Sequence, residues 1–420
     1  MKLTKLLPVL VGLLLKNIAA HAGEIDPACS TPFGDLLSEG LRTHPSITVS
    51  KKLMLASELQ LSSANWAYYP TPTLNISGSL SNTRTTIRID QPIWDGGKID
   101  ASYDNAKAQK EEALHSYSES QYQLIEDYVS ALQKYLQAQD QITIMDAGLQ
   151  QLDSIMHTID RMIEADELSL ADKNLLNTKI ADINSKLTIA NAEFDVAKIK
   201  FEILTGREIN CGVVLANSSI FDEGIDITTL VEDALYFHPA LRILDARIAA
   251  AQSEVSSANS KFWPALKLRA EHKKGSLYDS DSSQEESLVY LALEMSTGAG
   301  ASVLSDVERS KINVLKVKNQ KLAKEKQVID ALMNNYTQFV SVKNNIKIVS
   351  NDVEVAEKVF SSNKRMFFLQ QKKWIDVVNA LLILNNKKIS KHKLMSKYKA
   401  LEMTLALKTN RLLLETGSAL

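Results

Sequence analysis

The sequence predicts a mainly α protein with a transmembrane β part, built from two tandem helix-strand-strand-helix-helix repeats. Three observations support this fold class. Apolar residues recur at alternating steps of four and three over very long segments, which is the pattern of coiled-coil helices. Apolar and polar residues alternate with period two in four shorter segments, as in half-exposed strands. The two halves of the chain also match each other at a nearly constant offset, which indicates an internal duplication.

The composition is that of a large, folded and nearly neutral protein. Of 420 residues, 45% are hydrophobic and 23% are charged, and only 15 Gly and 9 Pro are present to interrupt long elements. The 48 basic and 50 acidic residues give a formal charge of −2, so no nucleic-acid partner is expected. Two cysteines are too few for a four-cysteine zinc site.

Residues 1–22 have the features of a secretory signal peptide. Two lysines precede an apolar stretch from Leu6 to Leu15, and Ala20-His21-Ala22 supplies small residues for a cleavage site. Cleavage would remove three lysines and no acid, leaving 45 minus 50, or a charge of −5. An ordinary hydrophobic N-terminal helix is the alternative. No later apolar run reaches the ~20 residues of a membrane helix, so any membrane crossing is expected to use strands.

The two cysteines, Cys29 and Cys211, each lie just ahead of one of the repeats. In an oxidising compartment they could form a disulfide, and two unpaired thiols are the alternative. The residues before Cys29, Asp26-Pro27-Ala28, lack the apolar residue of a lipid-attachment motif. We therefore expect no lipid anchor there.

The duplication defines the predicted domain boundaries. At an offset of 194 positions, His44-Pro45 aligns with His238-Pro239, and at an offset of 204, Asp172 aligns with Asp376. The predicted segments are repeat 1 at residues 23–206, a linker at 207–227, repeat 2 at 228–415 and a tail at 416–420.

Each repeat is expected to open with a helical segment of about 30 residues, followed by two strands of about ten residues, which can span a bilayer when tilted. The strands fall at about 72–94 in repeat 1 and about 265–296 in repeat 2. Proline cannot continue helical hydrogen bonding, so the preceding helices should end at Pro70 and Pro264. A pair of soluble hairpins is the alternative. Glycines that allow the turn from strand to helix mark the strand exits, at Gly96, Gly97, Gly298 and Gly300.

Long helical hairpins follow the strands. In repeat 1 the long helices occupy about 99–205, with a tip near Asp166, and in repeat 2 they occupy about 300–415, with a tip near Gln370. The first of these helices would be about 100 Å long at 1.5 Å per residue. A helix of this length suits the spanning of a distance better than the building of a catalytic pocket.

Residue patterns of an enzyme are missing from the sequence. No two of the seven histidines have the spacing of a helical metal pair, and there is no Gly-rich phosphate loop or nucleophile elbow. His44 and His238 precede prolines at equivalent repeat positions, which indicates a structural role. We expect no catalysis, no cofactor and no metal.

The order of these patterns, with Tyr69-Pro70-Thr71-Pro72-Thr73-Leu74 and Gln91-Pro92-Ile93-Trp94-Asp95-Gly96-Gly97, resembles the TolC family of outer-membrane efflux and secretion channels. The resemblance implies a homotrimer whose chains each give four strands to a twelve-stranded β-barrel in outer-membrane lipid. A long periplasmic α-helical barrel would continue it. The implied partners are a periplasmic adaptor protein and an inner-membrane ABC exporter or drug pump, and the channel itself would be passive.

The resemblance also places a pore constriction at the periplasmic helix tips. Asp376 matches the first of two acidic positions three residues apart, and Asn379 stands at the second. A solvated tip carboxylate is the alternative for Asp376. The family's tip links align with Phe367 and Lys372, facing Ala171 and Asp172. Because phenylalanine has no hydroxyl and lysine lacks the arginine fork, we expect fewer links, with Lys372 to Asp172 as the candidate.

Two export roles compete within the family. The segment at residues 91–97 and the expected absence of a lipid anchor favour type I protein secretion over multidrug efflux. A periplasmic coiled-coil scaffold without a pore is an alternative from another class. It would explain the heptads and the signal peptide but not the four amphipathic strands.

Overall fold

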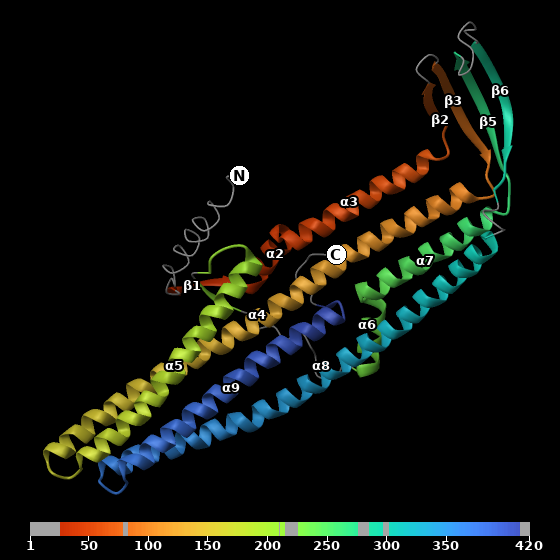
Figure 1. Ribbon diagram of the computed structural model, residues 1–420. Helices are drawn as coiled ribbons and strands as arrows, with labels where there is room; N and C mark the ends of the chain where they lie inside the picture. The colour runs from red at the N-terminus through yellow and green to blue at the C-terminus, as the bar shows by residue number, and fades with distance from the viewer. Residues whose placement is uncertain are drawn as a thin grey trace, which may run out of the picture. The chain divides into compact units, whose positions relative to one another are not determined.

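The computed structural model describes residues 26–78, 83–209, 211–214, 226–275, 285–296 and 302–411 (Figure 1). The chain divides into two compact units, and each is considered by itself. The tip unit comprises Met1–His44, Gln123–Leu230 and Ala331–Leu420, and the sheet unit comprises Pro45–Tyr122 and Val231–Asp330. Both units therefore take segments from both sequence repeats.

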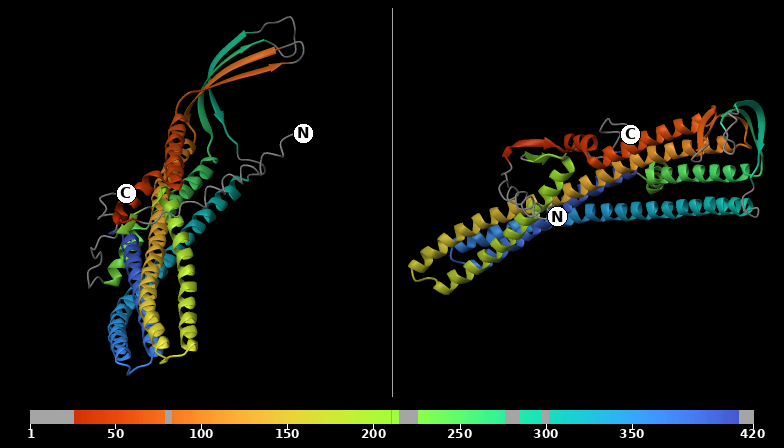
Figure 2. Two further views of the ribbon diagram at one scale, coloured as in Figure 1. Left: turned by 90° about the vertical axis from the view of Figure 1, so that its left-hand side faces the viewer. Right: turned by 45° about the horizontal axis from the view of Figure 1, so that its top comes forward.

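The sheet unit contains the four predicted strands. They are β2 (Thr71–Gly78), β3 (Thr83–Trp94), β5 (Ala265–Lys274) and β6 (Glu285–Glu294). They form one antiparallel sheet in the order β2-β3-β5-β6, seen in the left view of Figure 2. The central pair joins the two repeats, with Ile87 opposite His272 and Asp90 opposite Arg269. The strands β2 and β6 are the edges of the sheet.

Pro92 lies within β3, yet it does not interrupt the sheet. The register of β3 on β5 shifts between Pro92 and Trp94, and the pairing of β3 with β2 reaches only to Asp90. Pro92 therefore sits at an irregularity without a β2 neighbour, where a missing N–H is tolerated.

Long helices run from the sheet unit into the tip unit. They are α4 (Lys98–Glu164) and α8 (Val303–Phe368), and each is followed by a return helix, α5 (Leu170–Thr205) or α9 (Trp374–Lys408). The predicted mainly α fold with long helical hairpins is confirmed. In the tip unit these four helices share one apolar core, which includes Leu152 and Ile159 of α4, Leu176 of α5, Phe367 of α8 and Leu381 of α9.

The segment that opens each repeat is two helices, whereas the sequence pattern predicted one. Repeat 1 has α2 (Phe33–Thr43) and α3 (Pro45–Trp66), and repeat 2 has α6 (Ile227–Phe237) and α7 (Pro239–Ser260). His44 and His238 separate them in extended conformation, with ψ of 134° and 117°. The cause is the proline that follows each histidine, because proline disfavours helical geometry in the residue before it.

A short parallel sheet in the tip unit was not expected from the sequence. It pairs β1 (Asp26–Pro32) with β4 (Cys211–Val214), and Thr31 lies opposite Val213. β4 lies inside the predicted linker at residues 207–227. β4 has only four residues, and β1 has two prolines and no alternation of apolar and polar residues, so no period-two pattern marks either strand.

Candidate functional site

One face of the four-stranded sheet is apolar and exposed. Alternation brings Leu74 opposite Ile87 and Leu268 opposite Leu291 on this face. Val289 and Leu293 of β6 are 73% and 68% exposed in the single chain. An exposed and largely apolar sheet face is typical of a surface that another molecule or a membrane covers.

The opposite face of the sheet carries a ladder of ion pairs. Arg269 Nε lies 2.6 Å from Asp90 Oδ1, its Nη2 lies 2.7 Å from Glu294 Oε1, and Arg88 Nη2 lies 3.0 Å from Glu271 Oε1. Further pairs are Lys267 with Glu294 at 2.9 Å and Lys273 with Glu271 at 3.3 Å. All of these pairs join adjacent strands except Lys273 with Glu271, which lies within β5. Basic groups are thus paired with acidic ones, so this polar face holds little unbalanced charge.

The predicted junction residues lie where strands meet helices. Pro70 lies between α3 and β2, and Pro264 lies between α7 and β5. Gly96 and Gly97 have φ of +68° and +84°, and a Cβ at Gly96 would come within 2.6 Å of the Trp263 Cβ. Positive φ and this close approach both favour glycine. Gly298 and Gly300 lie outside the described residues.

Asp95, at the same junction, caps the N-terminus of the long helix α4 with its side chain. Its carboxylate accepts hydrogen bonds from the backbone N–H groups of Gly97, Lys98 and Ile99, at 3.1, 3.1 and 2.7 Å. A carboxylate at a helix N-terminus satisfies free amides and interacts favourably with the helix dipole. Asp95 thus positions the start of α4. The sequence analysis named it within the segment at residues 91–97 but did not predict this role.

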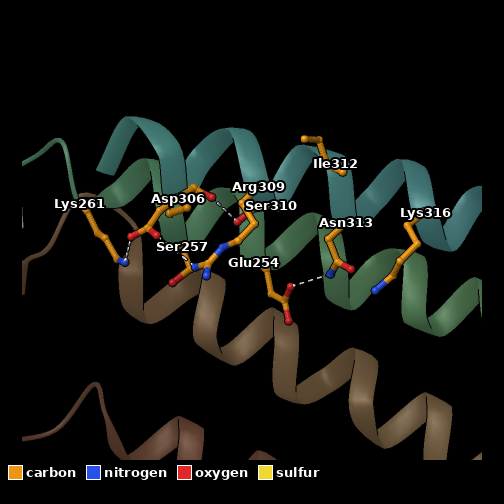
Figure 3. Close-up of a pocket in the computed structure, with 10 residues that line it drawn as sticks. Glu254, Ser257, Lys261, Asp306, Arg309, Ser310, Ile312, Asn313 and Lys316 are labelled. Carbon is orange, nitrogen blue, oxygen red and sulfur yellow. Dashed lines mark hydrogen bonds and ion pairs between the residues drawn. The ribbon is translucent and has the colours of Figure 1, made fainter. Parts of the chain in front are cut away.

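A groove of about 580 Å³ lies between α7 and α8 (Figure 3). Its charged residues bind one another: Lys261 Nζ lies 3.0 Å from Asp306, and Asn313 donates to Glu254 at 3.1 Å. The hydrogen bond from Lys261 lowers the pKa of Asp306. These contacts connect α7 to α8 and indicate a role in packing.

The two hairpin tips have the same backbone turn. Asp166 and Gln370, at the predicted tips, have φ of 59° and 57°. In each, the residue after the left-handed position donates back to the helix, Glu167 N to Met162 O at 2.8 Å and Gln371 N to Met366 O at 2.9 Å. This is the Schellman arrangement, here with a residue other than glycine in the left-handed position.

Asp172 sits at the start of α5 in a capping box. Ser169 Oγ accepts from Asp172 N, and Asp172 Oδ2 accepts from Ser169 Oγ at 2.7 Å. The other carboxylate oxygen accepts a hydrogen bond from Trp374 Nε1 at 3.1 Å. The bonds from Ser169, and then that from Trp374, lower the pKa of Asp172.

The other predicted tip residues lie close together at the start of α9 and the end of α8. Asp376 is half-buried, Asn379 is exposed, and Phe367 is buried at 4% exposure in the tip core. Lys372 Nζ lies 3.9 Å from Asp376 Oδ2 of its own chain. Ala171 is exposed beside Asp172. The link from Lys372 to Asp172 that the resemblance implies stays a prediction.

The predicted disulfide concerns residues whose side chains lie outside the described part of the structure. Cys29 belongs to β1 and Cys211 to β4, so the pairing of these strands brings the backbones of the two segments together. The disulfide itself stays a prediction.

Among the described residues, no helix combines the length and hydrophobicity needed to cross a membrane. The same part of the chain holds no group of three His, Cys, Asp or Glu side chains suited to a metal ion.

Comparisons with known proteins place the fold. No protein-family model and no curated relative matches the chain. Solved structures do match. The outer-membrane channel OprN has a TM-score of 0.78 at 13% identity, over 92% of this chain and 94% of that one. The outer membrane protein VceC from Vibrio cholerae has a TM-score of 0.75 at 14% identity, over 90% and 95% of the two chains.

The chain has the fold of the TolC family of outer-membrane channels. The CmeC outer membrane channel of Campylobacter jejuni also matches, with a TM-score of 0.74 at 11% identity, over 90% of this chain and 86% of that one. The TolC-like fold that the resemblance implied is therefore confirmed.

Sequence reasoning missed the role of Trp374. It placed the tip link at Lys372 and gave Trp374 no role. The available signal was an aromatic residue two positions before Asp376, the residue that the duplication aligns with Asp172. Its partner is 202 positions away, and sequence periodicity does not reveal such a contact.

Proposed function

We propose that the protein is a passive channel of the bacterial outer membrane, formed by three copies and extended into the periplasm by its helices. The main support for this proposal is the sheet, which exposes one apolar face and has β2 and β6 as its outer strands. Backbone groups at such edges cannot remain unpaired in lipid. Pairing β6 of one copy with β2 of the next closes a twelve-stranded barrel from three chains, as in the family, and the apolar face then meets lipid.

Exposed apolar residues on the helices beside these edges support the same assembly. Val49 and Leu59 are exposed on α3, and Ile312 and Leu322 are exposed on α8. Counted from the strand end of each helix, Leu59 and Ile312 lie at about two turns, and Val49 and Leu322 at about five. Because α3 leads into β2 and α8 follows β6, pairing of the two edges would bring α3 of one copy beside α8 of the next. Their exposed apolar residues would then lie at matching distances from the sheet.

A second set of exposed apolar residues lies on two helices of the tip unit. Ile189 and Val196 are exposed on α5, and Ile348 and Val340 are exposed on α8. Counted from the tip end of each helix, both stripes fall between about five and eight turns. Ile189 and Val196 are seven residues apart, which is the spacing of a coiled-coil seam, and Val340 and Ile348 are eight apart. We propose that α8 of one copy packs against α5 of its neighbour.

Engineered cysteines test this assembly. We expect Leu59→Cys together with Ile312→Cys to give disulfide-linked dimers and trimers in membranes. The matched control replaces Ile312→Cys by Lys311→Cys, because the neighbouring residue points about 100° away around the helix. Equal crosslinking by the control pair, or a soluble monomer that needs no detergent for extraction, would contradict the channel and favour a scaffold.

The periplasmic tips are the proposed constriction of the pore. Three copies of Asp376 around an axis would repel one another and attract cations. Lys372, 3.9 Å from Asp376, would offset part of that charge, and Asn379 adds none. We expect Asp376→Asn to reduce the cation preference of single channels in planar bilayers, measured as a shift of reversal potential in a salt gradient.

The partners are an adaptor protein in the periplasm and an inner-membrane pump that supplies energy, because the channel itself would do no chemistry. We assign the cargo to type I protein secretion with an ABC exporter, on the segment at residues 91–97. A photo-crosslinker placed at Lys372 in cells tests this assignment. Capture of an ABC exporter with its adaptor would support it, whereas capture of a proton-driven drug pump would move the cargo to small molecules.

A further inference from the structure

We infer that four charged side chains select the register in which the two sequence repeats join in the sheet. The four are Arg88 and Asp90 of β3 and Arg269 and Glu271 of β5. They are specificity-determining residues for one strand pairing, that of β3 with β5. The inference concerns a single chain, so it stands apart from the proposed assembly of three copies.

The pairing of β3 with β5 joins strands that are not consecutive in the chain. In a hairpin, the turn and the loop length help to fix which residues face each other, and β2–β3 and β5–β6 are consecutive antiparallel strands. Between β3 and β5, however, the chain forms the elements from α4 to α7. Something other than a turn must therefore set the register of this pairing.

The apolar face of the sheet does not settle this register. A shift by one residue would move every apolar side chain to the polar face, which the alternation excludes. A shift by two residues keeps both faces. In one direction it would place Ile87 opposite Ala270, where His272 now lies, and Ile89 opposite Leu268. Apolar residues would then face apolar residues at both positions, so the apolar face accepts the shifted register as well as the observed one.

The polar face does distinguish the registers. Arg88 lies directly opposite Glu271, with Nη2 and Oε1 3.0 Å apart, and Asp90 lies directly opposite Arg269, with Oδ1 and Nε 2.6 Å apart. Opposite charges therefore face each other at two successive positions. The side chains of Glu271 and Arg269 are only 5% and 13% exposed, so water screens these pairs less than it screens surface pairs.

A shift by two residues in either direction would bring like charges together. Two attractive pairs would become two repulsive pairs or one pair of each kind. In one direction the pairs would be Arg88 with Lys273 and Asp90 with Glu271, and in the other they would be Arg88 with Arg269 and Asp90 with Lys267. Opposite charges directly across a strand pair stabilise it, and like charges destabilise it. Of the three registers, only the observed one has two attractive pairs.

Exchange of the two charges on β5 is the sharpest test, because it reverses the preference without changing the composition or the net charge. In the variant Arg269→Glu/Glu271→Arg, the observed register would place like charges opposite each other at both positions. The register shifted by two would instead place Arg88 opposite the carboxylate at position 269 and Asp90 opposite Lys267. We expect β3 and β5 to pair in the shifted register.

Cysteine pairs on the apolar face report which register forms. In a full-length chain with Cys29→Ala and Cys211→Ala, Ile87→Cys is combined with His272→Cys for the observed register or with Ala270→Cys for the shifted one. Directly opposite Cα atoms lie about 4.5–5.5 Å apart and suit a disulfide, whereas diagonal neighbours lie about 7–8 Å apart and do not. Oxidation of the folded protein is followed by electrophoresis of the denatured chain, because an intrachain disulfide changes its mobility.

With the native charges, we expect crosslinking of positions 87 and 272 to exceed that of positions 87 and 270 by about tenfold, and the β5 exchange should invert this ratio. The complementary exchange on β3, Arg88→Asp/Asp90→Arg, should restore the original ratio when it is added to the β5 exchange. The matched control is Lys274→Glu/Glu285→Lys. It exchanges a directly opposed pair of β5 and β6 and should leave the ratio unchanged.

Two results would overturn the inference. Dominant crosslinking of positions 87 and 272 in the β5 exchange would show that the helices at the strand ends set the register without the charges. If the β5 exchange yields no protease-resistant folded chain, the variant that carries both exchanges decides. Recovery of folded chain in that variant would support the selection by charge, and no recovery would overturn it.

Discussion

The two helix tips share the same turn conformation but differ in how deeply the following helix is buried. Both turn through a left-handed residue, Asp166 or Gln370, and both place an aspartate at the third position of the return helix. The first return helix, however, begins at Leu170, which is 69% exposed, and the second begins at Trp374, which is 3% exposed. The two repeats therefore keep the same turn, while the first residue of the return helix is exposed in one repeat and buried in the other.

The return helices differ in burial over their first turns. In α9 the buried residues include Val377, Val378 and Leu381, whereas the first turns of α5 bury only Leu176. The N-terminal caps differ in the opposite sense. Ser169 caps α5 through its side chain, and Lys373 at the equivalent position of α9 makes no side-chain cap hydrogen bond. Local hydrogen bonding holds the exposed helix start, and core packing holds the buried one.

Truncation of the first residue of each return helix should give the largest contrast. Trp374→Ala removes a buried indole and leaves a cavity, so we expect a loss of about 3–5 kcal/mol in the free energy of unfolding. Leu170→Ala, at the equivalent exposed position, should cost less than about 0.5 kcal/mol. Denaturant unfolding in detergent, followed by circular dichroism, measures both. Equal losses would show that the two tips are packed alike.

Exchange of the caps should have a smaller effect of opposite sign at the two tips. Ser169→Ala removes a capping box and should destabilise the start of α5 by about 1 kcal/mol. Lys373→Ser gives α9 a capping hydroxyl three residues before Asp376 and should stabilise it by about 0.5–1 kcal/mol. Hydrogen exchange of the first-turn amides reports each change. No gain from Lys373→Ser would mean that packing already fixes that helix start.

Glycine at the left-handed positions should have a still smaller effect. Gln370→Gly relieves a positive φ that costs a side chain about 1 kcal/mol, but it loses part of this through the greater freedom of glycine in the unfolded chain. Asp166→Gly should gain less, because aspartate tolerates this conformation better. Thermal unfolding of the two variants in parallel measures the difference. A larger gain at Asp166 would contradict this ranking.

Acidification should loosen the first tip, and this effect is the smallest because Asp172 is open to solvent. Its pKa is lowered in the folded protein by the bonds from Ser169 and Trp374. The ionised carboxylate therefore stabilises the tip above the ordinary aspartate range, about pH 4, and this contribution is lost as the pH falls through the lowered pKa. Asp172→Asn should remove this part of the pH dependence of amide exchange in α5. The same acid response in that variant would assign it to another group.

The sequence by itself determined the long helical hairpins and the four strands of the antiparallel sheet, in their order along the chain. Heptads fix a helix such as α4, alternation fixes strands such as β3, and the glycines at 96 and 97 mark the turn between them, because each depends on neighbours along the chain. The break at His44-Pro45 was also readable from the proline, although the helical pattern on both sides concealed it. Asp376 and Asp172 were recognised as equivalent by the duplication alone.

Only the tertiary structure decided which copy of an equivalent position is buried and what it touches. Periodicity defines the apolar face of a helix, but not the element that covers it, so Leu170 and Trp374 could not be told apart by pattern. The pairing of β1 with β4 and the bond from Trp374 to Asp172 likewise join segments far apart in the sequence. Such contacts depend on how the hairpins pack in three dimensions, and no local rule of the chain contains that information.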